Sequence, residues 1–387
     1  MTTTNPSSSP SLLRRVREHP TLAAALALNG PDRASALTML LLPFLGLAAS
    51  LHALRPDAAH AVPHDLRSVA SGTTFRMTEA RLEADLPGRA VMVGVANTAR
   101  YLAVRGGTDE VTVGRDGWLF LRSELAVHPQ EARDLHRRAD LIVDLSGRLR
   151  ARGVTLLVAV SPNKSRVQQA FLPGRHLPAW STDTYRAFQA LLRARGVSTV
   201  DLLTPMTAAA RAQTQYYRTD THWNQAGART AAAAVARTVR AAAPDLPAAT
   251  FVTAADPMAA RPGDLQRLMG LQDTPDGLRP PADREAQQHT VASGGSLGAG
   301  LLGAAPQVVL AGSSYGLRGN FHGALQQALG STVVNVSREG ADFSGSLRTY
   351  LRDPAFRDAP PRVLVWEIPE RFLPVPLADE DRRPLMP

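Results

Sequence analysis

One short stretch of this 387-residue sequence collects side chains that can move protons. The string "RTDTHWNQAG", residues 218 to 227, places Asp220 two positions before His222 and just ahead of an alanine-rich segment. Histidine titrates near neutral pH and can act as a base, and a carboxylate behind its ring fixes the tautomer and stabilises the imidazolium. The stretch therefore predicts the base half of a hydrolytic triad. The alternative is a helix N-cap made by Asp220 or Thr221 beside a surface histidine.

Such a base needs a nucleophile, and a serine pair stands in a suitable setting. Residues 307–312, "QVVLAG", have the branched apolar composition of a buried strand, and they run directly into Ser313 and Ser314. A serine hydroxyl is a poor nucleophile at neutral pH unless a base activates it, and backbone amides after the turn can stabilise an oxyanion. The segment predicts a nucleophilic serine, or alternatively a loop of small residues at a strand exit.

Alternating strands and helices are expected to position these residues. The predicted strands cover residues 154–160, 197–202, 307–312, 331–336 and 362–368, and the predicted helices cover 181–196, 225–243 and 319–329. This alternation predicts an α/β fold with a parallel sheet flanked by helices, and ligands of such sheets bind beyond the carboxyl ends of the strands. An Asp-Gly turn predicts a two-stranded hairpin within residues 108–121. Residues 250–305 are rich in Pro, Gly, Ala and Asp and are expected to form an irregular insertion.

The N-terminal region suggests export. Residues 34–54 contain no acid, lysine or arginine, and about 20 apolar residues cross a bilayer. Arginines before this segment predict a cytoplasmic N-terminus. We therefore expect a disordered cytoplasmic tail over residues 1–32 and a single-pass inner-membrane anchor over 33–54. The alternative is a signal peptide cleaved after Ala59-His60-Ala61.

The expected exported part is periplasmic and has three sections. A linker and the start of the exported region cover residues 55–107, a catalytic domain covers 108–375, and a C-terminal tail covers 376–387.

Composition limits the cofactors and partners. The formal charge is +9, but Lys164 is the only lysine, so the excess is arginine spread along the chain. Because no dense basic run with interleaved aromatic residues occurs, we expect no nucleic-acid partner. The sequence contains no cysteine, which excludes disulfides, thiolate metal sites and cysteine nucleophiles. Asp220 and His222 lack an evident third ligand, so neither a metal nor another cofactor is expected.

Several strings, in the same order along residues 108–373, resemble the alginate O-acetyltransferase family, the AlgJ/AlgX group of SGNH-hydrolase-like proteins. They are "DGWLFL" (116–121), "YYRTDTHWNQAG" (216–227), "GDLQRLMGL" (263–271), "LAGSSYG" (310–316), "GNFHGAL" (319–325) and "VLVWEIPERFL" (363–373). The resemblance implies an SGNH-like fold in which Asp220, His222 and Ser314 form the catalytic triad. Ser313 stands where the family commonly has threonine.

The resemblance also implies an activity and partners. The family transfers acetyl groups to hydroxyls of an exported polysaccharide through an acetyl-enzyme, and a membrane-bound O-acyltransferase is the implied donor partner. The sequence ends soon after "WEIPERFL", so we expect it to lack the C-terminal carbohydrate-binding module of the AlgX branch. A carbohydrate acetyl esterase with the same triad and a non-catalytic polysaccharide-binding scaffold are the alternatives. The sequence leaves the polysaccharide and the acetyl donor open.

Further residues are candidates for oxyanion or substrate contacts. Asn320 and Tyr315 are candidates for the oxyanion region, Arg218 for the groove, Trp223 for stacking on a pyranose ring, and Lys164 for a sugar or carboxylate contact. A structural role is the alternative for Trp223, and chance placement is the alternative for Lys164. Glu367 falls on a predicted buried strand, where a carboxylate needs a partner, and Arg371 is the candidate partner.

Overall fold

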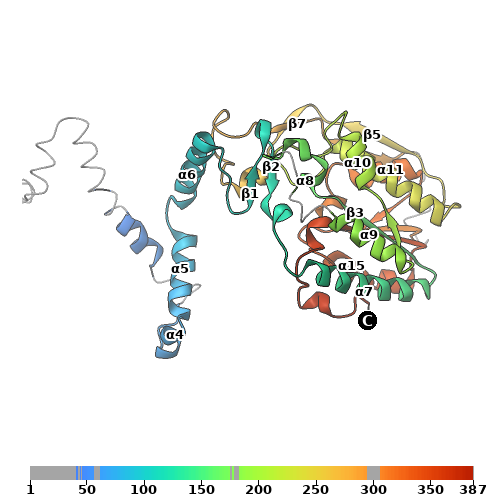
Figure 1. Cartoon of the computed structure of the whole chain (residues 1–387), viewed down its shortest axis with the longest axis horizontal. Coiled ribbons are helices and arrows are strands. Elements are labelled where there is room, and N and C mark those ends of the chain that lie inside the picture. Colours follow the sequence, from blue (N-terminus) through green and yellow to red (C-terminus); the bar gives the residue numbers. More distant parts are fainter. Residues whose placement is uncertain are drawn as a thin grey trace, which may run out of the picture. The chain divides into compact units, whose positions relative to one another are not determined.

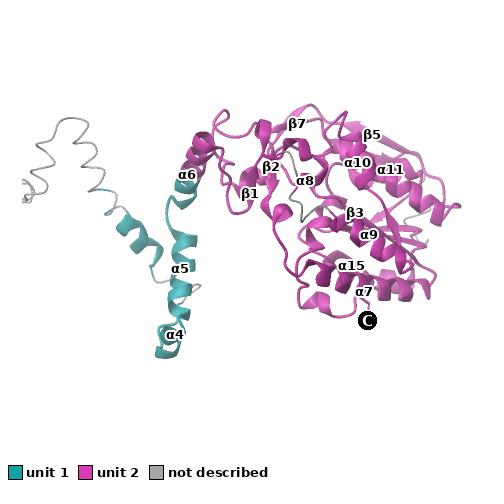
Figure 2. Ribbon diagram, viewed as in Figure 1, with its two compact units in different colours: residues 1–93 teal, residues 94–387 magenta. Residues whose placement is uncertain are grey.

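The structure is a computed structural model that describes residues 41, 44, 46–55, 62–174, 177, 183–293 and 306–386 (Figure 1). The chain divides into two compact units, residues 1–93 and 94–387 (Figure 2). The first unit contains α4 (Leu66–Ala70) and α5 (Thr73–Asp85), and α6 (Arg89–Val104) continues into the second unit. Asp65 caps α4 by accepting a hydrogen bond from the Ser68 amide.

The transmembrane anchor expected over residues 33–54 was wrong. Much of that segment lies outside the described residues, as does the expected tail over 1–32, and no described helix is long and apolar enough to cross a membrane. Within residues 33–54, the residues described as helical are 41, 44 and 46–53, fewer than the roughly 20 apolar residues that cross a bilayer.

A five-stranded parallel sheet forms the centre of the second unit, which confirms the predicted α/β fold. Its strand order is β10-β9-β11-β3-β4, and every neighbouring pair is parallel. The strands are β3 (Thr155–Ser161), β4 (Ser198–Val200), β9 (Val308–Ala311), β10 (Val334–Asn335) and β11 (Val363–Pro369). β9 and β11 are buried throughout, as expected for inner strands of a parallel sheet covered on both faces.

Helices cover both faces of this sheet. Figure 1 shows α7 (Glu131–Arg150) and α11 (Gln225–Ala242) on opposite sides of β3. α11 packs against α14 (Phe321–Leu329) and α10 (Leu203–Ala209), whereas α7 packs against α9 (Thr184–Ala194). The buried face of α11 carries Ala228, Ala231, Ala232 and Val235, which is the i, i+3, i+4, i+7 spacing of one helix face. The remaining short helices are α8 (Lys164–Val167), α12 (Asp264–Leu268), α15 (Gly345–Arg352) and α16 (Pro354–Asp358).

Two regions outside the sheet contain short strands. The predicted hairpin is present as β1 (Val111–Val113) and β2 (Leu119–Leu121), joined through left-handed residues at Asp116 and Gly117. Residues 250–293, expected to be irregular, instead contain two antiparallel ribbons. β5 (Phe251–Ala255) pairs with β8 (Gln288–Ala292), and β6 (Ala259–Arg261) pairs with β7 (Asp283–Glu285). These strands are short, partly exposed and poor in branched apolar residues, so hydropathy gives little signal for them.

Two buried arginines hold the segment that follows β11 against the helices. Arg138 on α7 donates hydrogen bonds to the carbonyls of Leu373 and Val375, at 3.1 and 2.6 Å. Arg348 on α15 donates to the carbonyls of Arg383 and Pro384, at 2.8 and 2.9 Å. Arg348 also lies 3.5 Å from the buried carboxylate of Asp381. The C-terminal segment is therefore part of the packed unit.

Replacing Arg348 should destabilise the protein without touching the sheet. In Arg348→Met the tail carbonyls lose their donors and Asp381 is left buried without its cation, which typically costs about 3–5 kcal/mol. Urea unfolding should show this loss. Arg352→Met, at an exposed position on the same helix, is the control and should stay within about 0.5 kcal/mol of the parent. Equal stability of the two variants would refute the tethering role.

Candidate active site

The structure brings Asp220, His222 and Ser314 into one hydrogen-bonded row. Ser314 directly follows Ser313 after β9, and the other two residues lie in the loop before α11. The Nε2 atom of His222 is 2.7 Å from Ser314 Oγ, and its Nδ1 atom is 2.7 Å from Asp220 Oδ1. Asp220 and His222 are buried, whereas Ser314 is half-buried. This is the geometry in which an imidazole can take a proton from a hydroxyl while a carboxylate orients the ring.

A buried glutamate fixes the turn that presents the serine. Glu367 on β11 accepts hydrogen bonds from the amide and hydroxyl of Ser313, both at 2.8 Å, and from the hydroxyl of Ser161 at 2.6 Å. Burial raises the pKa of Glu367, and the hydrogen bonds from the two serines oppose that rise. At Gly312 a Cβ atom would lie 2.8 Å from the Glu367 carboxylate, so the close approach of this strand end needs glycine.

Arg371 is therefore not the hydrogen-bonding partner that the sequence suggested for Glu367. Its guanidinium lies over the rings of Tyr315 and Phe372, at 5.5 and 5.0 Å from their centroids. Its positive charge acts on Glu367 only through space.

Lys164 holds the loop that carries the acid and the base. Its Nζ atom donates to the carbonyl oxygens of Arg218 and Asp220, at 2.8 and 2.9 Å, and lies over the rings of Trp118 and Phe120. The side chain is fully buried, and burial lowers its pKa from 10.5 to about 8. A fully buried ammonium does not reach a substrate, so this position favours a structural role over sugar contact.

Trp223 and Tyr315 also lie in the interior. The two rings form an edge-to-face pair with centroids 4.8 Å apart, and both side chains are almost fully buried. The Tyr315 hydroxyl donates to the Thr221 carbonyl at 2.8 Å, and the Trp223 indole donates to the Arg318 carbonyl at 3.3 Å. Tyr315 thus links the turn that carries Ser314 to the loop that carries His222, and the Trp223 ring packs against the Tyr315 ring.

The remaining two candidates, Asn320 and Arg218, do not line the cleft in front of the serine. Asn320 adopts a left-handed φ of 55° before α14 and donates its amide to Thr290. The backbone of Arg218 is held by Asp283 and Lys164. Their contacts favour roles in shaping the loops.

An open cleft of about 540 Å³ leads to Ser314. Its walls include Asp220, His222 and Ser314, together with Arg261, Asp264, Arg267, Gln272, Arg318 and Glu339.

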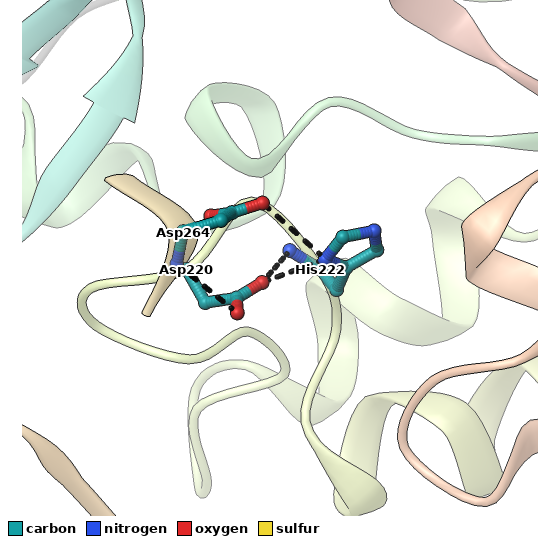
Figure 3. Close-up of side chains that lie close together, drawn as sticks. All are labelled: Asp220, His222 and Asp264. Carbon is teal, nitrogen blue, oxygen red and sulfur yellow. Dashed lines mark hydrogen bonds and ion pairs between the residues drawn. The ribbon is translucent and has the colours of Figure 1, made fainter. Parts of the chain in front are cut away.

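Two of these wall residues, which the sequence interpretation missed, lie close to the row formed by Asp220, His222 and Ser314. Arg261 donates to Asp220 Oδ2 at 2.9 Å, and Asp264 Oδ2 lies 3.7 Å from His222 Nδ1 (Figure 3). Asp264 belongs to the string "GDLQRLMGL", but its spacing along the chain gives no sign of contact with the histidine.

Asp220 is held in its charged form. Burial alone would raise the pKa of this carboxyl. The hydrogen bond and charge of His222, together with the Arg261 guanidinium, outweigh burial and hold the pKa of Asp220 well below its usual value of 3.8. The carboxylate is therefore ionised at neutral pH, as the orienting member of a triad must be.

Asp220, His222 and Asp264 present ligand atoms within 4.8 Å of one another, which raises the question of a metal ion. Each lone-pair donor already has a protein partner. Asp220 binds His222 and Arg261 through separate oxygens, and the Asp264 carboxylate accepts from the Thr221 amide and hydroxyl, at 2.8 and 2.6 Å. Since a guanidinium already balances the charge, these residues do not fit a divalent cation.

Comparison with known proteins gives consistent matches. Residues 111–370 match the family model described as "SGNH hydrolase-like domain, acetyltransferase AlgX". The chain is 34% identical over 318 residues to the probable alginate O-acetylase AlgJ of Pseudomonas aeruginosa, covering 79% of this chain and 81% of that protein. It is 30% identical over 285 residues to the alginate biosynthesis protein AlgX of Azotobacter vinelandii, covering 70% of this chain and 56% of that protein.

Solved structures agree with the sequence matches. The O-acetyltransferase domain of Pseudomonas putida AlgJ has a TM-score of 0.63 and 32% identity, covering 71% of this chain and 95% of that chain. Pseudomonas aeruginosa AlgX, with a TM-score of 0.54 and 24% identity over 67% of this chain and 62% of that chain, shares the fold. The resemblance seen in the sequence motifs is thereby confirmed. This chain belongs to the AlgX family of SGNH hydrolase-like acetyltransferases.

Proposed function

We propose that this protein transfers acetyl groups to hydroxyls of an exported polysaccharide through an acetyl-enzyme on Ser314. The observation that carries the proposal is the unbroken row from Ser314 through His222 to Asp220, with both hydrogen bonds at 2.7 Å and the serine open to a cleft. A row of this kind activates a hydroxyl that is otherwise a poor nucleophile.

The proposed reaction has two half-reactions. Ser314 Oγ attacks the acetyl carbonyl of the donor as its proton passes to His222 Nε2, and the proton then leaves on the departing donor oxygen. A sugar hydroxyl next gives its proton to His222 and attacks the acetyl-enzyme. The bond to Ser314 breaks, and the serine recovers the proton from His222. Asp220 keeps the ring in the tautomer that both steps need and stabilises the imidazolium.

A backbone amide is available for the oxyanion. Within the described part of the chain, no hydrogen-bond acceptor contacts the amide of Ser314, while the neighbouring Ser313 amide is taken by Glu367. An amide at the nucleophile itself is a common oxyanion donor. Since Glu367 locks the turn, this donor is held in place before the substrate arrives.

The substrate and location in this proposal rest on the relatives. AlgJ of Pseudomonas aeruginosa is named a probable alginate O-acetylase and AlgX an alginate biosynthesis protein. We infer for this chain an exported polysaccharide acceptor, an acylated membrane-bound O-acyltransferase as donor partner, and a periplasmic site of action within a biosynthetic complex. Arg267 on the cleft wall suits an acidic polymer, whereas Arg318 is paired with Glu339. The absence of cysteine suits an extracytoplasmic compartment.

Hydrolysis of carbohydrate acetyl esters is the competing function, because the cleft is open and polar and Ser314 is half-buried. The test is to incubate the protein with a chromogenic acetyl ester, with and without oligosaccharides, and to follow acetate and acetylated product by mass spectrometry. Acetylated oligosaccharide supports transfer. Rapid acetate release that added oligosaccharide leaves unchanged supports an esterase.

Ser314→Ala and His222→Ala should each lower acetyl-ester turnover by about 10³-fold or more, because the members of a triad act as one unit. Ser198→Ala, at an exposed serine outside the cleft, is the control and should keep full activity. Circular dichroism should show the same fold in all three. Full activity in Ser314→Ala would instead support a non-catalytic scaffold.

Asp220→Asn should lower stability in a pH-dependent manner. The pKa of Asp220 is lowered in the folded state, so its stabilising contribution is fully present above about pH 4 and is lost as the pH falls through the folded-state value. We expect a deficit of about 3–5 kcal/mol at pH 7, typical of a broken buried pair. The deficit should shrink below about pH 4 in urea unfolding. Asp276→Asn, at an exposed ion pair, should show little deficit at any pH. A deficit in Asp220→Asn that stays constant down to pH 2 would contradict this account.

A further inference from the structure

Arg261 donates a hydrogen bond to the carboxylate oxygen of Asp220 that does not bind His222. Asp220 Oδ1 accepts from His222 Nδ1 at 2.7 Å and from the His222 amide at 2.9 Å. Asp220 Oδ2 accepts from Arg261 Nη1 at 2.9 Å. Because each oxygen has its own partner, turning the carboxylate about its Cβ–Cγ bond breaks contacts on both sides. The guanidinium therefore fixes the orientation in which the carboxylate meets the imidazole.

The arginine is itself held in place. Its guanidinium lies over the ring of Tyr217, 3.8 Å from the centroid, and the Tyr217 hydroxyl donates to Glu285. Glu285 is on β7, which pairs with the strand that carries Arg261. Stacking on an aromatic face and a planar donor fork are properties of arginine that lysine lacks. Arg261 is thus positioned by Tyr217, whose hydroxyl is bound by Glu285 of the β6–β7 ribbon.

The ribbon formed by β6 and β7 also binds the backbone of the loop that carries His222. Asp283 lies opposite Arg261 in the pairing of β6 with β7. Its carboxylate accepts from the amides of Arg218 and Thr219, at 2.8 and 3.0 Å, and from the Thr219 hydroxyl at 2.9 Å. One strand of the ribbon therefore fixes the loop backbone, and the other fixes the side chain of Asp220.

We propose that Arg261 is a positioning residue for the triad, acting through Asp220 to keep His222 aligned with Ser314. This inference rests on the proposed function, because alignment matters only where His222 takes the proton of Ser314. Because Arg261 lies on the cleft wall, the alternative role is that its guanidinium binds an acidic group of the acceptor. The two roles differ in which substrates they affect, since only positioning matters for a small neutral ester.

The test compares Arg261→Met, Arg261→Lys and Arg284→Met. Arg284 lies on β7 in the same ribbon, exposed to solvent, and is the matched control. Two assays are used. One follows hydrolysis of p-nitrophenyl acetate, which carries no acidic group. The other follows the rate at which phenylmethylsulfonyl fluoride labels Ser314, read by intact-protein mass, which reports activation of the hydroxyl without any acetyl chemistry.

Arg261→Met should lower kcat for the neutral ester by about 10- to 100-fold with little change in KM, because small misplacements of catalytic groups cost rates of that order. The labelling rate should fall in parallel. Arg261→Lys should recover part of both rates, since an ammonium can still donate to Asp220, and Arg284→Met should match the parent.

Parent-like rates in Arg261→Met would overturn the inference. So would an effect confined to KM for acidic oligosaccharides, which would assign Arg261 to acceptor binding. If the parent protein labels at Ser314 but neither transfers nor hydrolyses acetyl groups, the proposed function fails instead. The labelling rates of the variants then still decide the role of Arg261.

Discussion

The hydrogen bond between His222 and Ser314 joins parts of the chain 92 residues apart, and the chemistry that we propose for the protein depends on it. A bond of this kind has a narrow range of useful geometry, so both ends must be fixed independently. The parallel sheet supplies one fixed end, because β9 ends at the serine turn and Glu367 on the neighbouring strand binds that turn. The other end is a loop with little regular structure of its own, and it needs support from elsewhere.

That support comes from buried polar groups. Lys164 binds two carbonyl oxygens of the loop, Asp283 binds two of its amides, and the hydroxyl of Tyr315 binds a third carbonyl. Buried polar groups are costly unless they are paired, and these are paired with backbone atoms of the loop. These contacts hold the main chain of the loop, so the side chain of His222 can lie between Asp220 and Ser314.

Sequence reasoning succeeded where a local pattern carries the information. The branched apolar runs predicted the parallel strands, and the Asp-x-His and Gly-x-Ser strings identified three side chains that the structure places in contact. It missed Arg261, which contacts Asp220, and Asp264, which approaches His222. Both lie at or just after β6, and neither β6 nor its partner β7 has a distinctive hydropathy. Residues such as Trp223, Tyr315 and Lys164 were suggested as substrate contacts because of their chemistry, yet each is buried. The expected membrane anchor was wrong, since no described helix is long and apolar enough to cross a membrane.

The burial of Lys164 has a consequence for how the protein handles an activated acyl group. It is the only lysine in the sequence, and its amine has no exposed surface. Amines capture acyl groups from esters and form amides that do not revert under mild conditions. An acetyl ester formed on Ser314, as proposed, would therefore find no accessible lysine amine in the same chain at which the acetyl group could be irreversibly trapped.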